Sequence, residues 1–303
     1  MTTTSPHTGA SHLADELSFQ PDNWSRAAEL APQFNDALPA TGERAAVIGC
    51  GTSLYMARAF AALREAQGHG LTDAWPASDH RLDRGYDRVV AITRSGTTTE
   101  ILAALDAYTG SARITVITST AGTPILDLGE PILVPEFDEK SVVQTRFATS
   151  VLALLRSHLG DDLSTPIRQA REVLAESEES LAVARGAEQI TFVGMGWAAA
   201  LADESALKLR ESTQSWAEAY WATEYRHGPI SISAPGRAVW ALGELVPNFA
   251  RDIALTGADL IHHDIDPMAE LVRVQRLCVL RAADRGLDPD KPRNLERSVI
   301  LDS

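Results

Sequence analysis

The feature that most constrains the fold is a repeated alternation of short apolar runs, turns rich in Gly, Ser and Thr, and segments of helical period. Continuous apolar runs of three to five residues are typical of strands that are buried on both faces. Such strands alternating with helices indicate βαβ units, in which helices cover both faces of a parallel sheet. In the first half, this pattern predicts strands at 45–48, 89–92, 114–117 and 132–134, and helices at 24–38, 53–67, 98–108, 124–128 and 142–158.

The same alternation begins again after a charged helical stretch at 167–185, with predicted strands at 190–193, 238–242 and 260–262. We therefore predict two α/β domains of similar plan. The irregular last residues, which contain two prolines, are expected to fold back over a site. The predicted divisions are a flexible tail over 1–23, a first domain over 24–160, a connector helix over 161–187, a second domain over 188–286 and a C-terminal tail over 287–303.

Charge and hydropathy exclude several classes of partner. The formal net charge of -14 repels polyanions, and no run of Lys and Arg compensates, so nucleic acid is not an expected partner. No stretch approaches the roughly 18 apolar residues that a membrane span needs. The first residues lack the basic and apolar regions of a secretion signal, so we expect a cytoplasmic protein with no membrane partner.

The cysteines and histidines give no metal-binding pattern. Cys50 and Cys278 are far apart and have no ligand spacing, which favours neither a zinc site nor a disulfide framework. His262 and His263 are adjacent on a predicted strand, so their side chains point to opposite faces. We expect no metal and no cofactor.

Two turns in the first half are rich in hydrogen-bond donors. The strand ending at Ile48 runs into Gly-Cys-Gly-Thr-Ser at 49–53, and the strand ending near Thr93 runs into Thr-Arg-Ser-Gly-Thr-Thr-Thr-Glu at 93–100. Glycine, hydroxyls and a helix N-terminus together suit an oxyanion, although a tight turn with a capping serine explains the first turn equally well. Parallel strands present both turns at their carboxyl edge, so the turns can converge on one anion.

A third turn carries a weaker signal. Residues 194–199 read Gly-Met-Gly-Trp-Ala-Ala, which superficially matches a dinucleotide fingerprint. Trp197 would crowd a pyrophosphate, so an NAD-dependent oxidoreductase is a disfavoured alternative.

The region 203–229 carries the candidate catalytic groups. Glu204, Lys208 and Glu211 lie near one helix face, which is also the pattern of a solvated ladder of ion pairs. An aromatic stretch follows and ends in Arg-His-Gly-Pro, with the histidine at position 227. A carboxylate and a histidine beside aromatic walls are suited to proton transfer near neutral pH.

Six motifs in this order resemble the sugar isomerase (SIS) family over the chain from about residue 25 to its end. They are GCGTS at 49–53, TRSGTTTE at 93–100, EKSVVQTRFATS at 139–150, ESALKLRES at 204–212, YRHGP at 225–229 and DKPRNLERSV at 290–299. The pattern is most similar to the isomerase half of glutamine–fructose-6-phosphate aminotransferases and to SIS-type glucosamine-6-phosphate deaminases.

The resemblance implies two flavodoxin-like SIS domains and an isomerase that interconverts aldose and ketose sugar phosphates, with deamination of an amino-hexose 6-phosphate as a further reaction. It implies that Glu211 shuttles a proton between C1 and C2, that Lys208 supports it, and that His227 helps to open the ring. In relatives this histidine reaches a neighbouring subunit, so a homodimer is implied. The substrate-binding residues that the resemblance implies are Gly51, Thr52, Ser53, Thr93, Arg94, Ser95, Thr98, Ser141 and Arg297.

Two departures from the family pattern narrow these expectations. The sequence shows no glutaminase domain and no Cys at position 2, so we expect no glutaminase activity. Arg297 stands where synthase relatives have an imine-forming Lys, and a guanidinium stays protonated and cannot form an imine. The alternative of another class is a sugar-phosphate-binding regulator that uses the same turns without chemistry.

Overall fold

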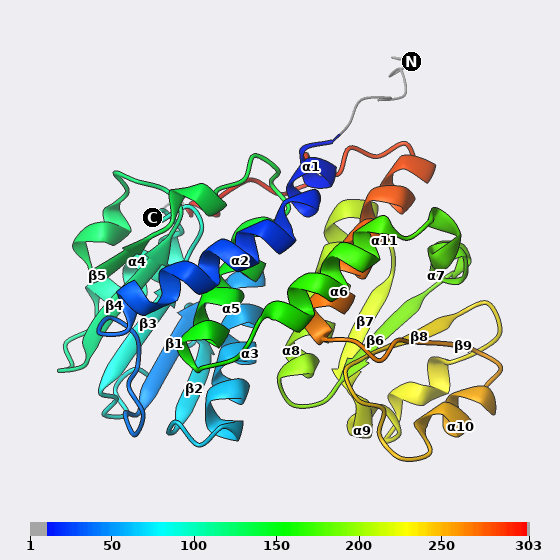
Figure 1. The fold of residues 1–303 in the computed structure, drawn as a ribbon, viewed down its shortest axis with the longest axis horizontal. Coiled ribbons are helices and arrows are strands. Elements are labelled where there is room, and N and C mark those ends of the chain that lie inside the picture. The colour runs from blue at the N-terminus through cyan, green and yellow to red at the C-terminus, as the bar shows by residue number, and fades with distance from the viewer. Residues whose placement is uncertain (1–10, 302–303) are drawn as a thin grey trace.

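The computed structural model describes residues 11–301 and contains two parallel sheets flanked by helices (Figure 1). The first sheet has the strand order β2-β1-β3-β4-β5, which is the order of flavodoxin-like folds. All of its neighbouring strands pair in parallel. Its strands are β1 (Ala45–Gly49), β2 (Thr72–Pro76), β3 (Arg88–Ile92), β4 (Arg113–Thr118) and β5 (Glu130–Leu133).

The second sheet repeats this plan with one strand fewer. Its order is β7-β6-β8-β9, again parallel throughout. In both sheets the chain forms an inner strand first, then an edge strand on one side, and then crosses to the other side. The strands are β6 (Ile190–Gly194), β7 (Ala217–Trp221), β8 (Ala238–Leu242) and β9 (Asp259–His262).

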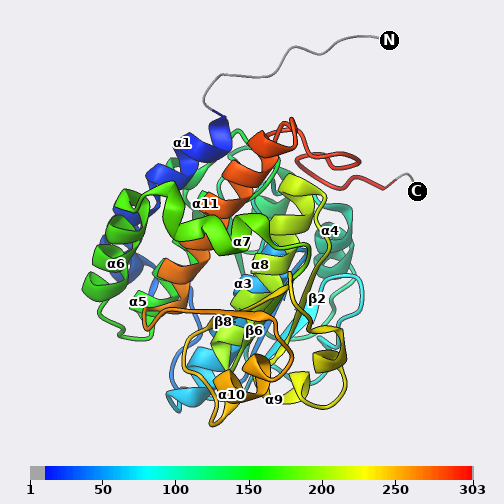
Figure 2. The same ribbon diagram turned by 90° about the vertical axis from the view of Figure 1, so that its right-hand side faces the viewer.

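Helices between the sheets join them into one structure. Helices α3 (Thr52–Ala66) and α8 (Trp197–Thr213) pack against each other, and α8 also packs against α11 (Pro267–Asp284) (Figures 1 and 2). One buried apolar cluster is shared by the two sheets. It includes Val47 of β1 and Phe60 of α3 as well as Phe192 of β6 and Trp240 of β8. The remaining α-helices are α1 (His12–Ser18), α2 (Gln20–Leu30), α4 (Thr99–Asp106), α5 (Arg146–His158), α6 (Ser164–Ala175), α7 (Ala182–Gly186), α9 (Ala222–Tyr225) and α10 (Phe249–Ala254).

The predicted α/β class with parallel sheets flanked by helices is confirmed. The predicted strands correspond to β1, β3, β4, β5, β6, β8 and β9, but the edge strands β2 and β7 were missed. Both edge strands mix polar and apolar residues, and β2 ends in Pro76. The division into two domains stays a prediction. Among residues 11–301, no helix combines the length and apolar character that a bilayer span requires.

Two predicted segments need correction. Residues 12–23 were predicted as part of a flexible tail, but they form α1 and the beginning of α2, while 1–10 lie outside the described residues. The hydroxyl of Ser11 caps α1, and Leu13 and Leu17 are buried. The predicted connector helix at 161–187 is instead α6, a short 3-10 helix η4 (Glu178–Leu181) and α7, because the chain is extended at Glu176 and Ser177.

The turn between β1 and α3 requires glycine at position 49. A Cβ on Gly49 would lie 2.6 Å from the backbone carbon of Ser53, whereas a Cβ on Gly186 would meet nothing within 4 Å. We expect Gly49→Ala to destabilise the protein by about 1–3 kcal/mol, as overpacking does, and Gly186→Ala to be close to neutral. Urea unfolding midpoints of both variants test this, and equal midpoints would contradict the tight packing of the turn.

Candidate functional site

The two hydroxyl-rich turns meet at the carboxyl edge of the first sheet. The chain passes from β1 to β2 on one side and then to β3 on the other, so the turns after β1 and β3 flank the point where the strand order reverses. The structure brings them to one small cavity, which is lined by Ser53, Thr93, Arg94, Ser95 and Thr98 together with Cys50, Gln144 and Arg297. The two turns therefore converge as predicted, whereas binding of an anion between them stays a prediction.

Gly51 gives the first turn its shape. Its φ of 54° and ψ of -125° are rarely adopted by residues with a side chain, and it precedes the first residue of α3. The first N–H groups of α3 are partly used within this turn, because Ser53 donates to the carbonyl of Cys50 at 3.1 Å and Leu54 to that of Gly51 at 3.0 Å. The positive end of the helix dipole still favours negative charge near Ser53, which lines the cavity.

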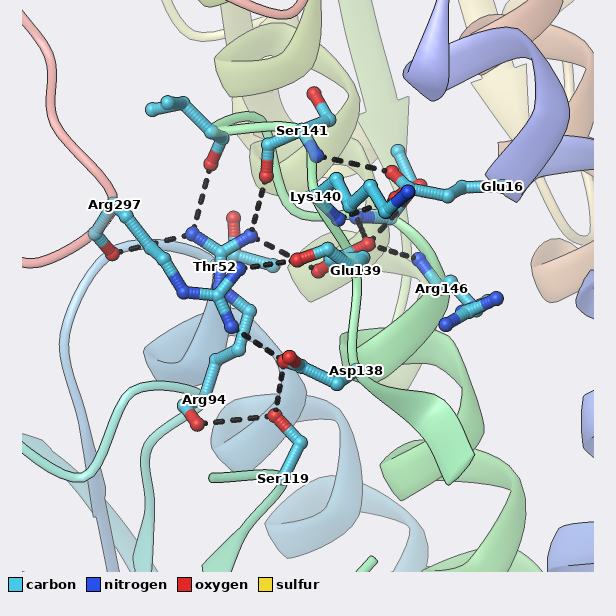
Figure 3. A network of polar contacts seen from close by, with 12 residues as sticks. Glu16, Thr52, Arg94, Ser119, Asp138, Glu139, Lys140, Ser141, Arg146 and Arg297 are labelled. Carbon is cyan, nitrogen blue, oxygen red and sulfur yellow. Dashed lines mark hydrogen bonds and ion pairs between the residues drawn. The ribbon is translucent and has the colours of Figure 1, made fainter. Parts of the chain in front are cut away.

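Arg94 lies in the second turn but points into the protein rather than toward the cavity opening. Its side chain is 1% exposed, and it donates to Glu139 Oε1 at 3.2 Å and to the carbonyl oxygens of Ser141 at 2.9 Å and Val142 at 3.0 Å (Figure 3). It also donates to the carbonyl of Arg297 at 3.2 Å. Burial lowers the pKa of Arg94, against the attraction of Glu139. Arg94 thus holds neighbouring segments of the site, and its two terminal nitrogens are already bonded to protein acceptors.

Glu139 is a site residue that the sequence analysis did not single out. It is fully buried, and besides Arg94 it accepts from the backbone N–H groups of Thr145 at 2.9 Å and Arg146 at 2.8 Å. These N–H groups begin α5, where a carboxylate is stabilised by the helix dipole. An acidic residue shortly before a helix was the only local signal for it.

The C-terminal residues lie against both turns. Arg297 donates to Asp138 Oδ1 at 2.5 Å and to the carbonyl of Glu139, so its guanidinium is held at the cavity rim (Figure 3). The hydroxyl of Ser298 accepts from Ser95 Oγ at 3.1 Å and from Thr97 Oγ1 at 2.9 Å. Residues 287–301 contain no helix or strand, in agreement with the irregular tail that was predicted.

Lys208 connects the two halves of the chain. Its ammonium group is 1% exposed and donates to Thr52 Oγ1 at 2.9 Å and to Glu211 Oε2 at 2.6 Å. Thr52 is the first residue of α3, whereas Lys208 and Glu211 are in the last turns of α8. Lys208 therefore connects the predicted catalytic carboxylate of Glu211 to Thr52 in the first hydroxyl turn.

Glu204 lies on the other side of Lys208, with its Oε1 atom 3.5 Å from Nζ. Burial raises the pKa of Glu204 to about 8, although Lys208 opposes this. Burial by itself would lower the pKa of Lys208, but the charges of Glu204 and Glu211 raise it instead. Lys208 therefore stays charged between the two carboxylates, and the raised pKa of Glu204 favours its protonated form near pH 7.

His227 lies far from Glu211 within the chain. Glu211 is about 21 Å along α8 from Trp197, which follows the carboxyl end of β6. His227 is exposed and follows α9 at the carboxyl end of the parallel neighbour β7. His227 thus lies at the carboxyl end of the strands of the second sheet, whereas Glu211 lies toward their amino end. The two residues are therefore not paired within one chain.

Several buried polar atoms at or near the cavity have no hydrogen-bond partner within residues 11–301. Among them are Oγ of Ser141, Oε1 of Gln144 and Nε of Arg94. Gln144 lines the cavity, whereas Ser141 contributes its backbone to the Arg94 contacts. Unpartnered buried acceptors and donors are rare in native proteins and call for an explanation, of which a missing ligand is one.

The third turn lacks donors of this kind. In this turn Trp197 and Ala198 follow Gly196, whereas in the first turn Thr52 and Ser53 follow Gly51. Within residues 11–301, no three His, Cys, Asp or Glu side chains are grouped as metal ligands would be. His262 instead bonds the carbonyl of Gly243 at 2.9 Å, and His263 bonds Glu270 at 2.8 Å.

The fold and site define a class: a parallel α/β protein with a small hydroxyl-lined cavity at the reversal of its strand order and a buried lysine–carboxylate pair beside it. No family model matches the chain. Curated relatives named glutamine–fructose-6-phosphate aminotransferase (isomerizing) are 28% identical in Halobacterium salinarum and 27% in Methanothermobacter thermautotrophicus. The alignments cover 84% and 86% of this chain but 51% and 52% of the relatives, so the chain spans about half of their length.

Solved structures support the same fold. Glucosamine-6-phosphate deaminase from Thermotoga maritima superimposes with a TM-score of 0.75 at 24% identity, covering 96% of this chain and all of the other. Tagatose-6-phosphate ketose/aldose isomerase from Escherichia coli gives 0.80 at 18% identity, covering 100% and 99%. The resemblance that the six motifs predicted is confirmed, because the relatives carry these names.

The protonated state of Glu204 predicts a pH-dependent stability. Its folded pKa of about 8 exceeds the ordinary value of 4.5, so the folded state keeps a proton that the unfolded state loses between these values. Stability should therefore fall as pH rises from about 4.5 to about 8. Glu204→Gln removes this dependence, so its melting temperature should rise relative to wild type across that window.

The matched control is Glu172→Gln, which changes a side chain that is 59% exposed and paired only with Arg168. Its melting temperature should run parallel to that of wild type at every pH. A difference between Glu204→Gln and wild type that stays constant from pH 5 to pH 8 would contradict a protonated Glu204.

Proposed function

We propose that the chain is a phosphosugar isomerase that interconverts aldose and ketose sugar phosphates. The observation that carries this proposal is the Lys208 bridge, which fixes Glu211 beside the hydroxyl turn that starts at Gly51. An aldose and a ketose interconvert through an enediol, which needs a carboxylate near C1 and C2 and a donor for the developing oxyanion. The names of the relatives and of the structural neighbours support the same reaction class.

In this proposal the phosphate binds in the cavity between the two turns. Ser53, Thr93, Ser95 and Thr98 supply hydroxyls there, and the positive end of the α3 dipole favours an anion beside Ser53. Thr52, Gly51 and the loop at Ser141 then surround the sugar, and Arg297 lies at the rim. Arg94 contributes through the loop that it holds, since its terminal nitrogens already donate to protein acceptors.

Glu211 then acts as the base that removes the proton from one carbon and returns it to the other. Lys208 donates a hydrogen bond to this carboxylate at 2.6 Å, which orients it, while the raised pKa of Glu204 favours its protonated form. The ammonium group is also the nearest fixed positive charge to Glu211, so it offsets the negative charge that develops in the enediol.

His227 enters the proposal through a second copy of the chain. It is exposed and lies at the opposite sheet edge from Glu211, so ring opening by His227 requires a homodimer that brings it to the partner's site. Trp221, which is 53% exposed in the single chain, lies six residues before it. Both exposed side chains belong to the segment at and just after the carboxyl end of β7, which supports an interface at this edge.

Deamination of an amino-hexose 6-phosphate is a second candidate reaction. It is compatible with Arg297, whose guanidinium cannot form an imine and is bound to Asp138. Isomerisation of the amino sugar places a C=N bond at C2 of the substrate itself, and water then adds to that carbon and displaces ammonia, so no imine with the enzyme is needed. The deaminase from Thermotoga maritima, which has the same fold, supports testing this reaction first.

A thermal-shift screen against hexose 6-phosphates and amino-hexose 6-phosphates tests substrate binding. A ligand at 100 times its Kd should stabilise the folded state by about 2.7 kcal/mol. Ligands that shift the melting temperature are then followed by NMR for 1,2-isomerisation and by an assay for ammonia. Binding without turnover would favour the regulator instead, and binding of NADH would favour the oxidoreductase.

Glu211→Gln tests the proton shuttle. The amide keeps the shape of the side chain but cannot accept the proton, so kcat should fall by about 100-fold to 10,000-fold while KM changes little. Exchange of the C2 proton with deuterated solvent, followed by NMR, should fall in parallel. The control is Glu188→Gln, which alters a side chain that is 67% exposed. Full turnover by Glu211→Gln would exclude the shuttle.

A further inference from the structure

Glu16 is a buried carboxylate on α1 that the proposed reaction does not use. It is 6% exposed and accepts hydrogen bonds from the backbone N–H of Lys140 and from that of Ser141 at 3.3 Å (Figure 3). These partners are more than 120 residues away along the chain. The contact therefore ties the beginning of the described chain to the loop beside the candidate site.

The peptide groups around Ser141 are held from two sides. Glu16 binds the N–H of Ser141, and Arg94 donates to its carbonyl at 2.9 Å. Arg94 belongs to the second hydroxyl turn, so the same hydrogen bonds connect α1, the loop 138–144 and the anion cavity. The loop also carries the unpartnered Oγ of Ser141 and Oε1 of Gln144, and Gln144 lines the cavity.

The helix that carries Glu16 is itself held by the C-terminal segment. Asp290 accepts from the N–H groups of His12 at 2.7 Å and Leu13 at 2.8 Å, which are the first two residues of α1. The carbonyl of Asp290 accepts from the N–H of Val142 at 3.2 Å. The helix, the loop and the start of the C-terminal tail thus form a closed ring of hydrogen bonds next to the cavity.

The position of Glu16 is costly for a carboxylate. Burial raises its pKa, although the N–H groups of Lys140 and Ser141 oppose this, and the neighbouring charges are those of Glu139 and Arg146. An apolar side chain could fill the same space without desolvating a charge, but it could not orient two backbone N–H groups. A buried carboxylate at position 16 is therefore explained if the site needs the 138–144 loop in a fixed orientation.

We propose that Glu16 is a positioning residue for the substrate site, which fixes the 138–144 loop so that Ser141 and Gln144 face the bound sugar phosphate. This inference rests on the proposed function. Loss of the two hydrogen bonds leaves the loop less ordered, so KM should rise by about tenfold or more. Glu16 touches no reacting atom, so kcat should change far less than KM.

The experiment compares Glu16→Gln and Glu16→Ala with the control Asp15→Asn, which alters the neighbouring exposed carboxylate of the same helix. The first readout is hydrogen exchange of the Lys140 and Ser141 amides in the protein without ligand. Both amides should exchange faster in the Glu16 variants, and their exchange rates should be unchanged in the control. The second readout is KM and kcat for the sugar phosphate that wild type turns over.

The outcomes separate this inference from the proposed function. Faster exchange with a raised KM and a nearly unchanged kcat supports it, and Glu16→Gln keeps the test available if Glu16→Ala does not fold. Unchanged exchange, or an unchanged KM in folded variants, would overturn the role of Glu16. If wild type binds no sugar phosphate, the proposed function fails, and the exchange measurement still reports whether Glu16 orders the loop.

Discussion

The buried ammonium group of Lys208 is the contact on which the arrangement of the site depends. A charge that is almost fully removed from water must be compensated, and here Thr52 and Glu211 do so at 2.9 and 2.6 Å. Thr52 starts the helix that follows the first strand of one sheet, whereas Lys208 and Glu211 end the helix that follows the first strand of the other. Satisfying the lysine therefore brings the carboxylate of one half of the chain to the anion turns of the other half.

Arg94 shows how a residue with the right chemistry for a ligand can serve the protein instead. A guanidinium in a hydroxyl-rich turn suggests an oxyanion partner, but the side chain is long enough to reach Glu139 and the carbonyls of Ser141 and Val142. Its charge is then neutralised inside the protein by a carboxylate 45 positions further along the chain. The short hydroxyl side chains of the same turn cannot reach so far and remain at the cavity.

Local patterns were sufficient for most of the strands and for the turns, and insufficient for two edge strands, for α1 and for the contacts between elements. Strands such as β1 and β3 are continuous apolar runs because both faces are buried, and that pattern is visible in the sequence. The edge strand β7 has half-exposed positions and lies among aromatic residues, which hides its period. The turns of the site were predicted because glycine and hydroxyls are adjacent in sequence. Glu16, Glu139 and Asp290 were missed because each acts on a segment whose proximity only the tertiary fold creates.

The two halves use one backbone turn for different purposes. Gly51 and Gly196 share a φ of 54° and have ψ values of -125° and -130°, and each precedes a long helix after the first strand of its sheet. In the second half the next residue is Trp197, whose ring lies 4.8 Å from the guanidinium of Arg156. Arg156 is bound in turn to Asp266, which caps α11, so this turn joins α5 to α11. Trp197 thus takes part in packing between helices, whereas Thr52 and Ser53 present hydroxyls after the first glycine. This difference favours the first half over the second as the place of the anion site that we propose.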